Sequence, residues 1–350
     1  MTLSPALYAD PAPRAVRLAI ALDSEELALP EGRVCIFRPR AGEDFSPLQM
    51  DRLHLVQSFF PDHMALAAAG YEVGTSSIPA PSALICLPRS KAEGLGLIAE
   101  AVAQGARMVL VDGQKTDGVE SVLKAVRMRV ATKGVVSKAH GKLFWFAPGD
   151  ADFSDWALQE AVVTDAVLGE FRTLPGLFSA DGADPASQLL AQALPEDLPA
   201  QMADLGAGWG YLSAACLARK GVEHLHLVEA EARALDLARR NITDPRARFH
   251  WADATSLTLS EPLDGVVMNP PFHTSRKAQP ALGLAFIAAA AQMLSGRGQL
   301  WMVANRHLPY EGALGDLFAQ HDILTETGAF RVWHASGPRT RSKTVLRHRR

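Results

Sequence analysis

The chain has 350 residues, of which 48% are hydrophobic and 21% are charged, an ordinary balance for globular domains. This length favours two domains, and the formal net charge of −3 gives no global signal for a nucleic-acid partner. No apolar run reaches the ~18 residues needed to span a bilayer, and no secretory signal is visible, so we expect a cytoplasmic protein without membrane segments.

Short apolar runs alternate with helical stretches in the first half, a pattern typical of βαβ units on a mostly parallel sheet. The predicted elements are strands at 16–22, 34–37, 83–87, 108–111 and 143–146, and helices at 91–104 and 118–127. No Gly-x-Gly turn follows any of these strands. We therefore predict no cofactor site in this half.

A transitional region joins the two halves. A helix is predicted at 156–168, and a segment rich in proline and glycine follows it at 174–185. We place the boundary between residues 164 and 165, which gives domains 1–164 and 165–350.

The second half repeats the order strand, turn, helix more regularly. Strands are predicted at 200–205, 224–229, 248–251, 263–268 and 299–304, with helices at 211–220 and 281–294 and a further helix that ends at Asn241. This alternation predicts a doubly wound sheet with ligands at the carboxyl ends of its strands.

A glycine-rich turn follows the first strand of this half, with glycines at Gly206, Gly208 and Gly210. Residues without Cβ allow a sharp turn and close approach of the backbone to a ligand. The next helix would present free N–H groups to a phosphate or an amino-acid carboxylate. Dehydrogenases use similar turns, so the glycines alone identify only an adenosine-like ligand.

Acidic residues at three strand ends narrow this choice. Glu229 is placed to accept hydrogen bonds from ribose hydroxyls, Asp253 from an adenine amino group, and Asp204 from an ammonium group. Together they fit S-adenosylmethionine better than a dinucleotide. The structural alternatives are a surface position for Glu229 and a turn cap for Asp253.

The most specific element is Asn269-Pro270-Pro271-Phe272, which ends the fourth strand of the second half. Its prolines stiffen the turn and remove N–H donors. The Asn269 side-chain oxygen and the Pro270 carbonyl would accept from one NH₂ group, and Phe272 would stack on a flat base or amide. With the glycine turn, this predicts methyl transfer from S-adenosylmethionine to an exocyclic or amide nitrogen, with Asn269 also near the cofactor.

Basic and polar residues continue this loop. His273, Arg276 and Lys277 are predicted to contact substrate, phosphates in particular; a structural hydrogen bond or a solvated loop is the alternative. Near the end of the chain, seven basic residues occur without an acidic one, which suggests a polyanionic partner or a solvated terminus: Arg331, Arg339, Arg341, Lys343, Arg347, Arg349 and Arg350. The scattered cysteines (Cys35, Cys86, Cys216) predict buried thiols, and we expect no metal.

These motifs resemble those of class I S-adenosylmethionine-dependent methyltransferases, and more narrowly those of the bacterial RsmC-type enzymes. The stretches at 174–179, 206–210, 269–273 and 303–310 carry the resemblance, together with 87–93 and 137–144 in the first half. The opening of the first half does not clearly follow the family pattern.

The resemblance implies two tandem Rossmann-like domains: a degenerate N-terminal one, and a C-terminal one with a class I seven-stranded doubly wound sheet. It implies that Gly206, Gly208, Glu229 and Asp253 bind cofactor and that Asn269 and Phe272 hold a guanine. The implied reaction is methylation of a guanine N2 amine in small-subunit ribosomal RNA. We expect a monomeric enzyme whose substrate is ribosomal RNA within a small-subunit particle.

Other targets stay open at this point. They are a large-subunit guanine, a DNA adenine or a protein glutamine, although protein glutamine enzymes usually carry Tyr where this chain has Phe272. An inactive RNA-binding assembly factor is the alternative from another functional class.

Overall fold

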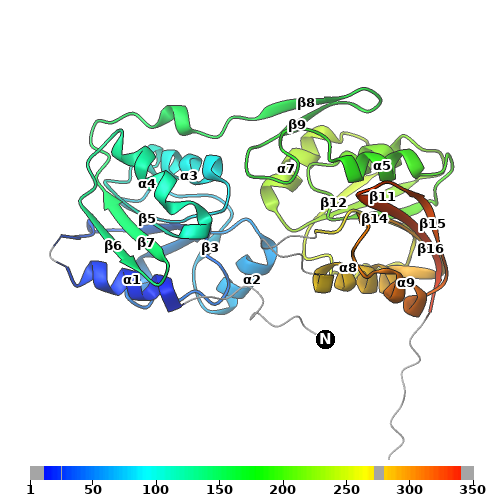
Figure 1. Cartoon of the computed structure of the whole chain (residues 1–350), viewed down its shortest axis with the longest axis horizontal. Coiled ribbons are helices and arrows are strands. Elements are labelled where there is room, and N and C mark those ends of the chain that lie inside the picture. The colour runs from blue at the N-terminus through cyan, green and yellow to red at the C-terminus, as the bar shows by residue number, and fades with distance from the viewer. Residues whose placement is uncertain (1–11, 25, 272–279, 340–350) are drawn as a thin grey trace, which may run out of the picture. The chain divides into compact units, whose positions relative to one another are not determined.

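A computed structural model describes residues 12–24, 26–271 and 280–339 (Figure 1). Contacts divide the chain into two units. Unit 1 comprises Met1–Ala161, Thr173–Ala180 and Glu231–Arg233, and unit 2 comprises Val162–Arg172, Asp181–Ala230 and Ala234–Arg350. Each unit contains a seven-stranded sheet, which confirms the predicted tandem α/β architecture. The boundary between residues 164 and 165 stays a prediction.

The sheet of unit 1 has the order β3-β2-β1-β4-β5-β7-β6, with β6 and β7 antiparallel to their neighbours. Its central strands are buried on both faces, so they form continuous apolar runs. The strands are β1 (Val34–Phe37), β2 (Leu53–Val56), β3 (Val73–Gly74), β4 (Ser82–Cys86), β5 (Met108–Gln114), β6 (Gly134–Lys138) and β7 (Gly141–Phe146); the helices are α1 (Ala12–Leu22), α2 (Phe60–Ala68), α3 (Lys91–Ala103) and α4 (Val119–Arg127).

The strand predicted at 16–22 is wrong, because these residues belong to helix α1. Leu18 and Ala21, three residues apart, are both fully buried, whereas Val16 and Ile20 are exposed on the other side. The apolar residues therefore follow the helical period. Arg17 is also buried, and its ion pair with Asp112 secures the helix on the sheet.

The helix predicted at 156–168 is wrong as well. The chain forms a short 3-10 turn at Ser154–Trp156 and then the hairpin β8 (Ala161–Asp165) and β9 (Gly169–Thr173). Valines favour strand over helix. Asp165 accepts from the N–H groups of Val167 and Leu168, which stabilises the turn of the hairpin.

The sheet of unit 2 has the order β12-β11-β10-β13-β14-β16-β15. The chain leaves β10 toward β11 on one side and returns to β13 on the other, so the switch point lies at the carboxyl end of β10. The strands are β10 (Gln201–Leu205), β11 (His224–Glu229), β12 (Ala247–Trp251), β13 (Leu263–Met268), β14 (Leu294–Asn305), β15 (Phe318–Glu326) and β16 (Phe330–Pro338); the helices are α5 (Pro185–Ala193), α6 (Tyr211–Leu217), α7 (Ala232–Asn241), α8 (Pro280–Met293) and α9 (Glu311–Leu317).

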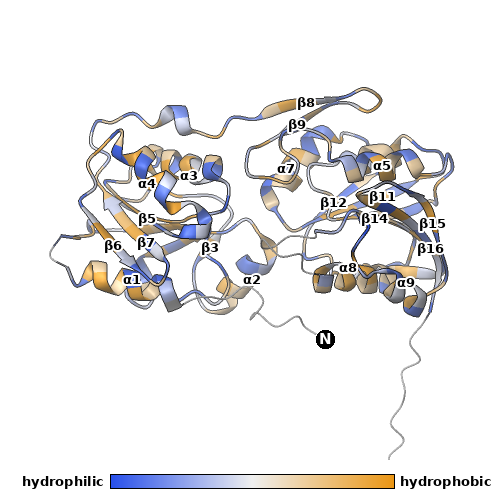
Figure 2. Cartoon of the chain, in the orientation of Figure 1, coloured by the Kyte–Doolittle hydropathy of each residue, from blue (hydrophilic) through white to orange (hydrophobic). Residues whose placement is uncertain are grey.

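Burial follows hydropathy in both units. Helix α8 is almost entirely apolar, and Figure 2 colours it mostly orange. Cys35, Cys86 and Cys216 are free and buried, as predicted. Within the described ranges, no helix has both the length and the apolar character that a bilayer crossing requires.

Candidate active site

The glycine turn has a backbone that only glycine adopts easily. Gly206, Gly208 and Gly210 have φ angles of 80°, 56° and 100°, all in the left-handed region. The N–H groups of Gly206 and Ala207 both donate to the carbonyl of Val228 on β11, at 2.9 and 3.1 Å. The turn is thus fixed to the neighbouring strand, and α6 begins directly after it.

Glu229 lies at the end of β11, beside this turn. Its Oε2 accepts a hydrogen bond of 2.8 Å from the Gly208 N–H. The side chain is half-buried and not on the open surface. The predicted ribose-binding carboxylate therefore lies against the predicted cofactor turn.

Asp204, the fourth residue of β10, is fully buried. Its Oδ2 accepts from the Ser213 hydroxyl at 2.7 Å, while its buried Oδ1 makes no hydrogen bond. Burial raises the pKa of Asp204 to about 7, with the charge of Glu229 adding to this rise and the bond from Ser213 opposing it. One carboxylate oxygen thus remains able to accept from a ligand or a water molecule.

Asp253 follows β12 and forms a turn cap. Its Oδ1 accepts from both the N–H and the hydroxyl of Thr255, at 2.8 and 2.7 Å. These bonds are those of a turn cap, which is the structural alternative given above for Asp253. They occupy one carboxylate oxygen, so a cofactor role for Asp253 stays a prediction.

Asn269 follows β13, whose Met268 is in register with Leu205 of β10. Its Nδ2 donates to Asp184 Oδ2 at 2.8 Å and to Ser187 Oγ at 2.9 Å. Pro270 is buried next to it. The other predicted substrate residues, Phe272, His273, Arg276 and Lys277, lie outside the described residues.

Four neighbouring strand ends therefore bring the predicted residues to one edge of the sheet. The registers of β12, β11, β10 and β13 align these ends. Figure 1 labels β11 and β12 of this group. Glycine, carboxylate and carboxamide groups meet there: Asp204, Gly206, Gly208, Gly210, Glu229, Asp253 and Asn269. Adjacent strand ends at a switch point are the usual ligand site of such sheets.

Sequence reasoning missed the residues that support this edge. Asp184 before Pro185 is a readable helix start, but its bond to Asn269 joins residues 85 positions apart. Asn241 bridges the Trp209 carbonyl and the backbone of Arg172 in the hairpin. Trp209 itself is buried against aromatic side chains and contributes packing.

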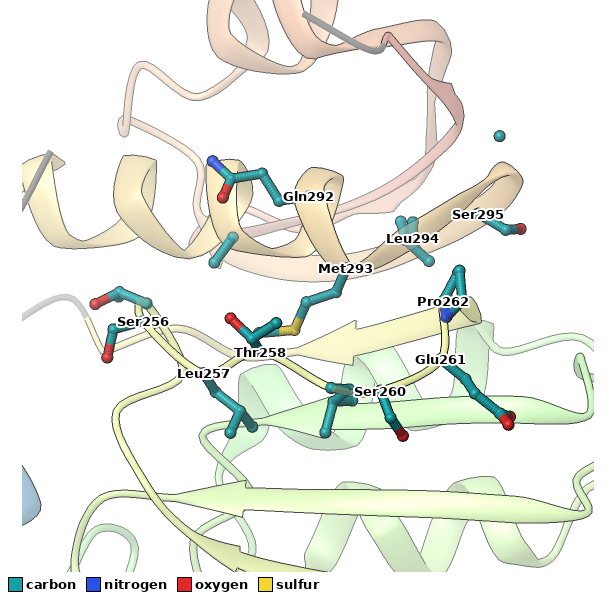
Figure 3. Close-up of a pocket in the computed structure, with 14 residues that line it drawn as sticks. Ser256, Leu257, Thr258, Ser260, Glu261, Pro262, Gln292, Met293, Leu294 and Ser295 are labelled. Atoms are coloured by element: carbon teal, nitrogen blue, oxygen red, sulfur yellow. The ribbon is translucent and has the colours of Figure 1, made fainter.

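A cavity of about 480 Å³ lies elsewhere in unit 2 (Figure 3). It is bounded by the loop 255–262 and by the end of α8. The lining extends from Ser256, which lies close to Asp253 in the chain, to Leu294 and Ser295 at the start of β14 (Figure 3). Among the described residues, no cluster of His, Cys, Asp or Glu is arranged to hold a metal ion.

Two of the seven basic residues near the end of the chain belong to the described part. Arg331 pairs with Glu326 at 2.9 Å, and Arg339 donates from Nε to the Phe318 carbonyl at 2.9 Å. Both already have protein partners. The other five lie outside the described residues.

Comparison with known proteins identifies similar chains. The family model for the methyltransferase small domain matches residues 169–334. Ribosomal RNA small subunit methyltransferase C of Shewanella sp. strain MR-4 is 30% identical, with 66% of this chain and 69% of the relative covered. The enzyme of the same name from Klebsiella pneumoniae subsp. pneumoniae is 32% identical over 48% of this chain, which spans about half (52%) of that relative.

A solved structure supports the fold over nearly the whole chain. It is the T. thermophilus 16S rRNA N2 G1207 methyltransferase in complex with AdoMet and guanosine. The TM-score is 0.75 and the identity 23%, with 93% of this chain and 94% of the other covered. This likeness shows the shared tandem architecture.

Proposed function

Because the chain belongs to the family of ribosomal RNA small subunit methyltransferase C, we propose that it methylates the exocyclic N2 amine of a guanine in small-subunit ribosomal RNA, using S-adenosylmethionine. The observation that carries this proposal is the position of Asn269. It lies one residue beyond β13, beside the glycine turn that follows β10.

The residues at the strand edge fit an adenosyl amino acid. A Cβ added at Gly208 would meet no atom within 4 Å, so this face of the turn is open to a ligand. The buried Oδ1 of Asp204 makes no hydrogen bond and would accept from an ammonium group, directly or through water. Glu229 would hold the ribose, and Asp253 the adenine. When bound, S-adenosylmethionine supplies an electrophilic methyl group.

The protein's own part in the reaction is to place the amine. The Asn269 Oδ1 and the Pro270 carbonyl would accept the two hydrogens of the guanine NH₂, which directs the nitrogen lone pair toward the methyl carbon. These acceptors also stabilise the positive charge that develops on nitrogen. No strong base is required, because the amine becomes acidic only as it is alkylated. Phe272 would stack on the guanine ring.

The target base has to be accessible. In a duplex, guanine N2 lies in the minor groove and takes part in pairing, so the enzyme requires a loop, an unfolded segment or a flipped base. We therefore propose a free small subunit or an assembly intermediate as substrate, with a monomeric enzyme. Equal methylation of free subunits and joined ribosomes would contradict this part.

Nucleoside mass spectrometry of ribosomal RNA from cells with and without the protein tests the substrate. The expected result is loss of N2-methylguanosine from one small-subunit site, restored by the wild-type chain. Unchanged small-subunit RNA together with loss of a methylated DNA adenine, a large-subunit guanine or a protein glutamine would replace the proposed target. Calorimetry with S-adenosylmethionine tests the alternative of an inactive RNA-binding assembly factor. Such a factor would show no affinity for the cofactor.

The role of Asn269 is tested by Asn269→Ala. Loss of an acceptor that acts in the transition state is expected to lower kcat on the order of 100-fold or more. The Kd for S-adenosylmethionine should change little, since the glycine turn and Glu229 remain. A variant with a much higher Kd for S-adenosylmethionine and an unchanged kcat would overturn this assignment.

A further inference from the structure

We propose that Asp184 and Ser187 are positioning residues that hold the Asn269 carboxamide in one orientation, with its oxygen toward the substrate amine. This inference rests on the proposed function, in which Asn269 accepts from that amine. Neither residue would touch substrate. Their action would pass entirely through the Asn269 amide.

The start of helix α5 fixes both groups. Asp184 is the N-cap residue, and its Oδ2 accepts from the Ser187 N–H at 2.9 Å. Pro185 at the first helical position has its φ angle set by its ring, which favours helix initiation here. Capping and helix geometry therefore hold the Asp184 carboxylate and the Ser187 hydroxyl side by side.

Both groups bind the same amide nitrogen. Asn269 Nδ2 donates to Asp184 Oδ2 at 2.8 Å and to Ser187 Oγ at 2.9 Å. Ser187 is only 5% exposed, and Asn269 is half-buried. These bonds use both hydrogens of the carboxamide NH₂ and leave Oδ1 as its remaining hydrogen-bonding atom.

The carboxylate decides which end of the amide faces it. An ionised carboxylate only accepts, so the amide can bind Asp184 through NH₂ and not through its oxygen. The reversed amide would place two acceptors together and lose a charge-assisted hydrogen bond. It would also present NH₂ donors to the substrate NH₂, which is itself a donor. A correctly oriented Asn269 is thus expected to be far more populated with Asp184 than without it.

Asp184→Asn separates this role from helix capping. Asparagine is as good an N-cap as aspartate, so helix α5 and the thermal midpoint should be preserved. Its added NH₂ can donate to Asn269 Oδ1, which permits the reversed amide. We expect kcat to fall at least tenfold while the Kd for S-adenosylmethionine stays within twofold.

Two further variants grade the effect. Asp184→Ser also caps the helix but removes the carboxylate without adding an amide donor, so its kcat should lie between those of wild type and Asp184→Asn. Ser187→Ala removes one of two acceptors and should lower kcat a fewfold. Gln192→Ala, at an exposed position of the same helix, is the matched control and should behave as wild type.

The outcomes are distinguishable. A higher Kd for S-adenosylmethionine with unchanged kcat would make Asp184 a cofactor contact and overturn the inference. If the decrease in kcat across the variants is proportional to the decrease in their thermal midpoints, the inference is also overturned, and Asp184 and Ser187 have a structural role. If Asn269→Ala is inactive but Asp184→Asn is fully active, the positioning role fails and the proposed function stands. If Asn269→Ala is fully active, the role of Asn269 fails and the positioning role fails with it, whereas the proposed methylation fails only if the wild-type chain itself is inactive.

Discussion

The carboxyl edges of the two sheets carry different residue types, glycine in unit 2 and arginine in unit 1. In unit 2, β10 is followed by Gly206 with φ 80°, and in unit 1 the equivalent strand β1 is followed by Arg38 with φ 57°. The backbone makes a similar left-handed step in both. Glycine leaves space at this step, whereas Arg38 fills it with a guanidinium group that pairs with Glu93 at 2.7 Å.

Helix α1 adds to this filling in unit 1. Arg17 Nε donates to Asp112 Oδ2 at 2.6 Å, and Arg14 Nε donates to Asp112 Oδ1 at 2.8 Å. Asp112 is fully buried on β5, and a cavity of about 90 Å³ remains beside these arginines. The corresponding edge of unit 2 carries glycines and carboxylates.

The comparison separates two contributions to a binding site. Strand order determines where the carboxyl ends gather, and it is identical in the two sheets. The side chains at that edge determine whether a ligand or an ion-pair network occupies it. Variants at matched positions of the two units therefore test whether this difference is functional.

The largest effect is expected at the ion-pair network of unit 1. Asp112→Ala leaves Arg17, 1% exposed, without its carboxylate partner. Removing one partner of a buried ion pair costs about 3–5 kcal/mol. Denaturant unfolding should show this loss while the Kd for S-adenosylmethionine measured on the remaining folded protein is unchanged. Glu120→Ala, which removes the exposed partner of Lys142, is the control and should have little effect.

A change in unit 2 should instead affect ligand binding. Gly208→Val places a branched side chain at φ 56°, on the open face of the turn, and we expect the Kd for S-adenosylmethionine to rise about 100-fold, through strain and blocked space. Gly105→Val in unit 1 is a matched control, because Gly105 also has a left-handed φ of 88° with no atom near its added Cβ. It should lose stability without losing cofactor affinity. Equal effects of the two variants on Kd would remove the distinction between the units.

Local signals explain what the sequence predicted well. The turn at Gly206 to Gly210 and the residues Glu229 and Asn269 each follow an apolar strand, so their common edge could be predicted from strand order. The segments at 16–22 and 156–168 were mispredicted because their apolar spacing fits two periods. Tertiary and local contacts select the observed structure. The ion pair of Arg17 with Asp112 holds the first segment as a helix, and the turn at Asp165 makes the second segment a hairpin.

Long-range partnerships were beyond such reasoning. Asp184 is readable as a helix cap, but its bond to Asn269 depends on where the fold places the start of α5 relative to the residue that follows β13. The sequence also does not predict that Arg38 occupies the position that Gly206 has in unit 2, because a positive φ at a non-glycine residue cannot be recognised from the sequence.

The smallest expected effect concerns the buried acid of unit 2. Folding raises the pKa of Asp204 from 3.8 to about 7, because burial disfavours its charge. The folded state then binds a proton that the unfolded state has released, so this group stabilises the fold below pH 3.8 and the contribution is lost as the pH rises to 7. Relative to Asp204→Asn, the wild type should lose on the order of 2 kcal/mol of unfolding free energy between pH 5 and pH 7.5.

Denaturant titrations of both proteins at these two pH values measure that difference. If the unfolding free energies of wild type and Asp204→Asn change equally between these pH values, Asp204 is already ionised at pH 5. Saturating S-adenosylmethionine should reduce the difference if its ammonium group binds the free Oδ1, since a neighbouring positive charge favours the carboxylate. Unit 1 offers the contrast, because its buried Asp112 already has two guanidinium partners at the corresponding edge and gains nothing from the cofactor.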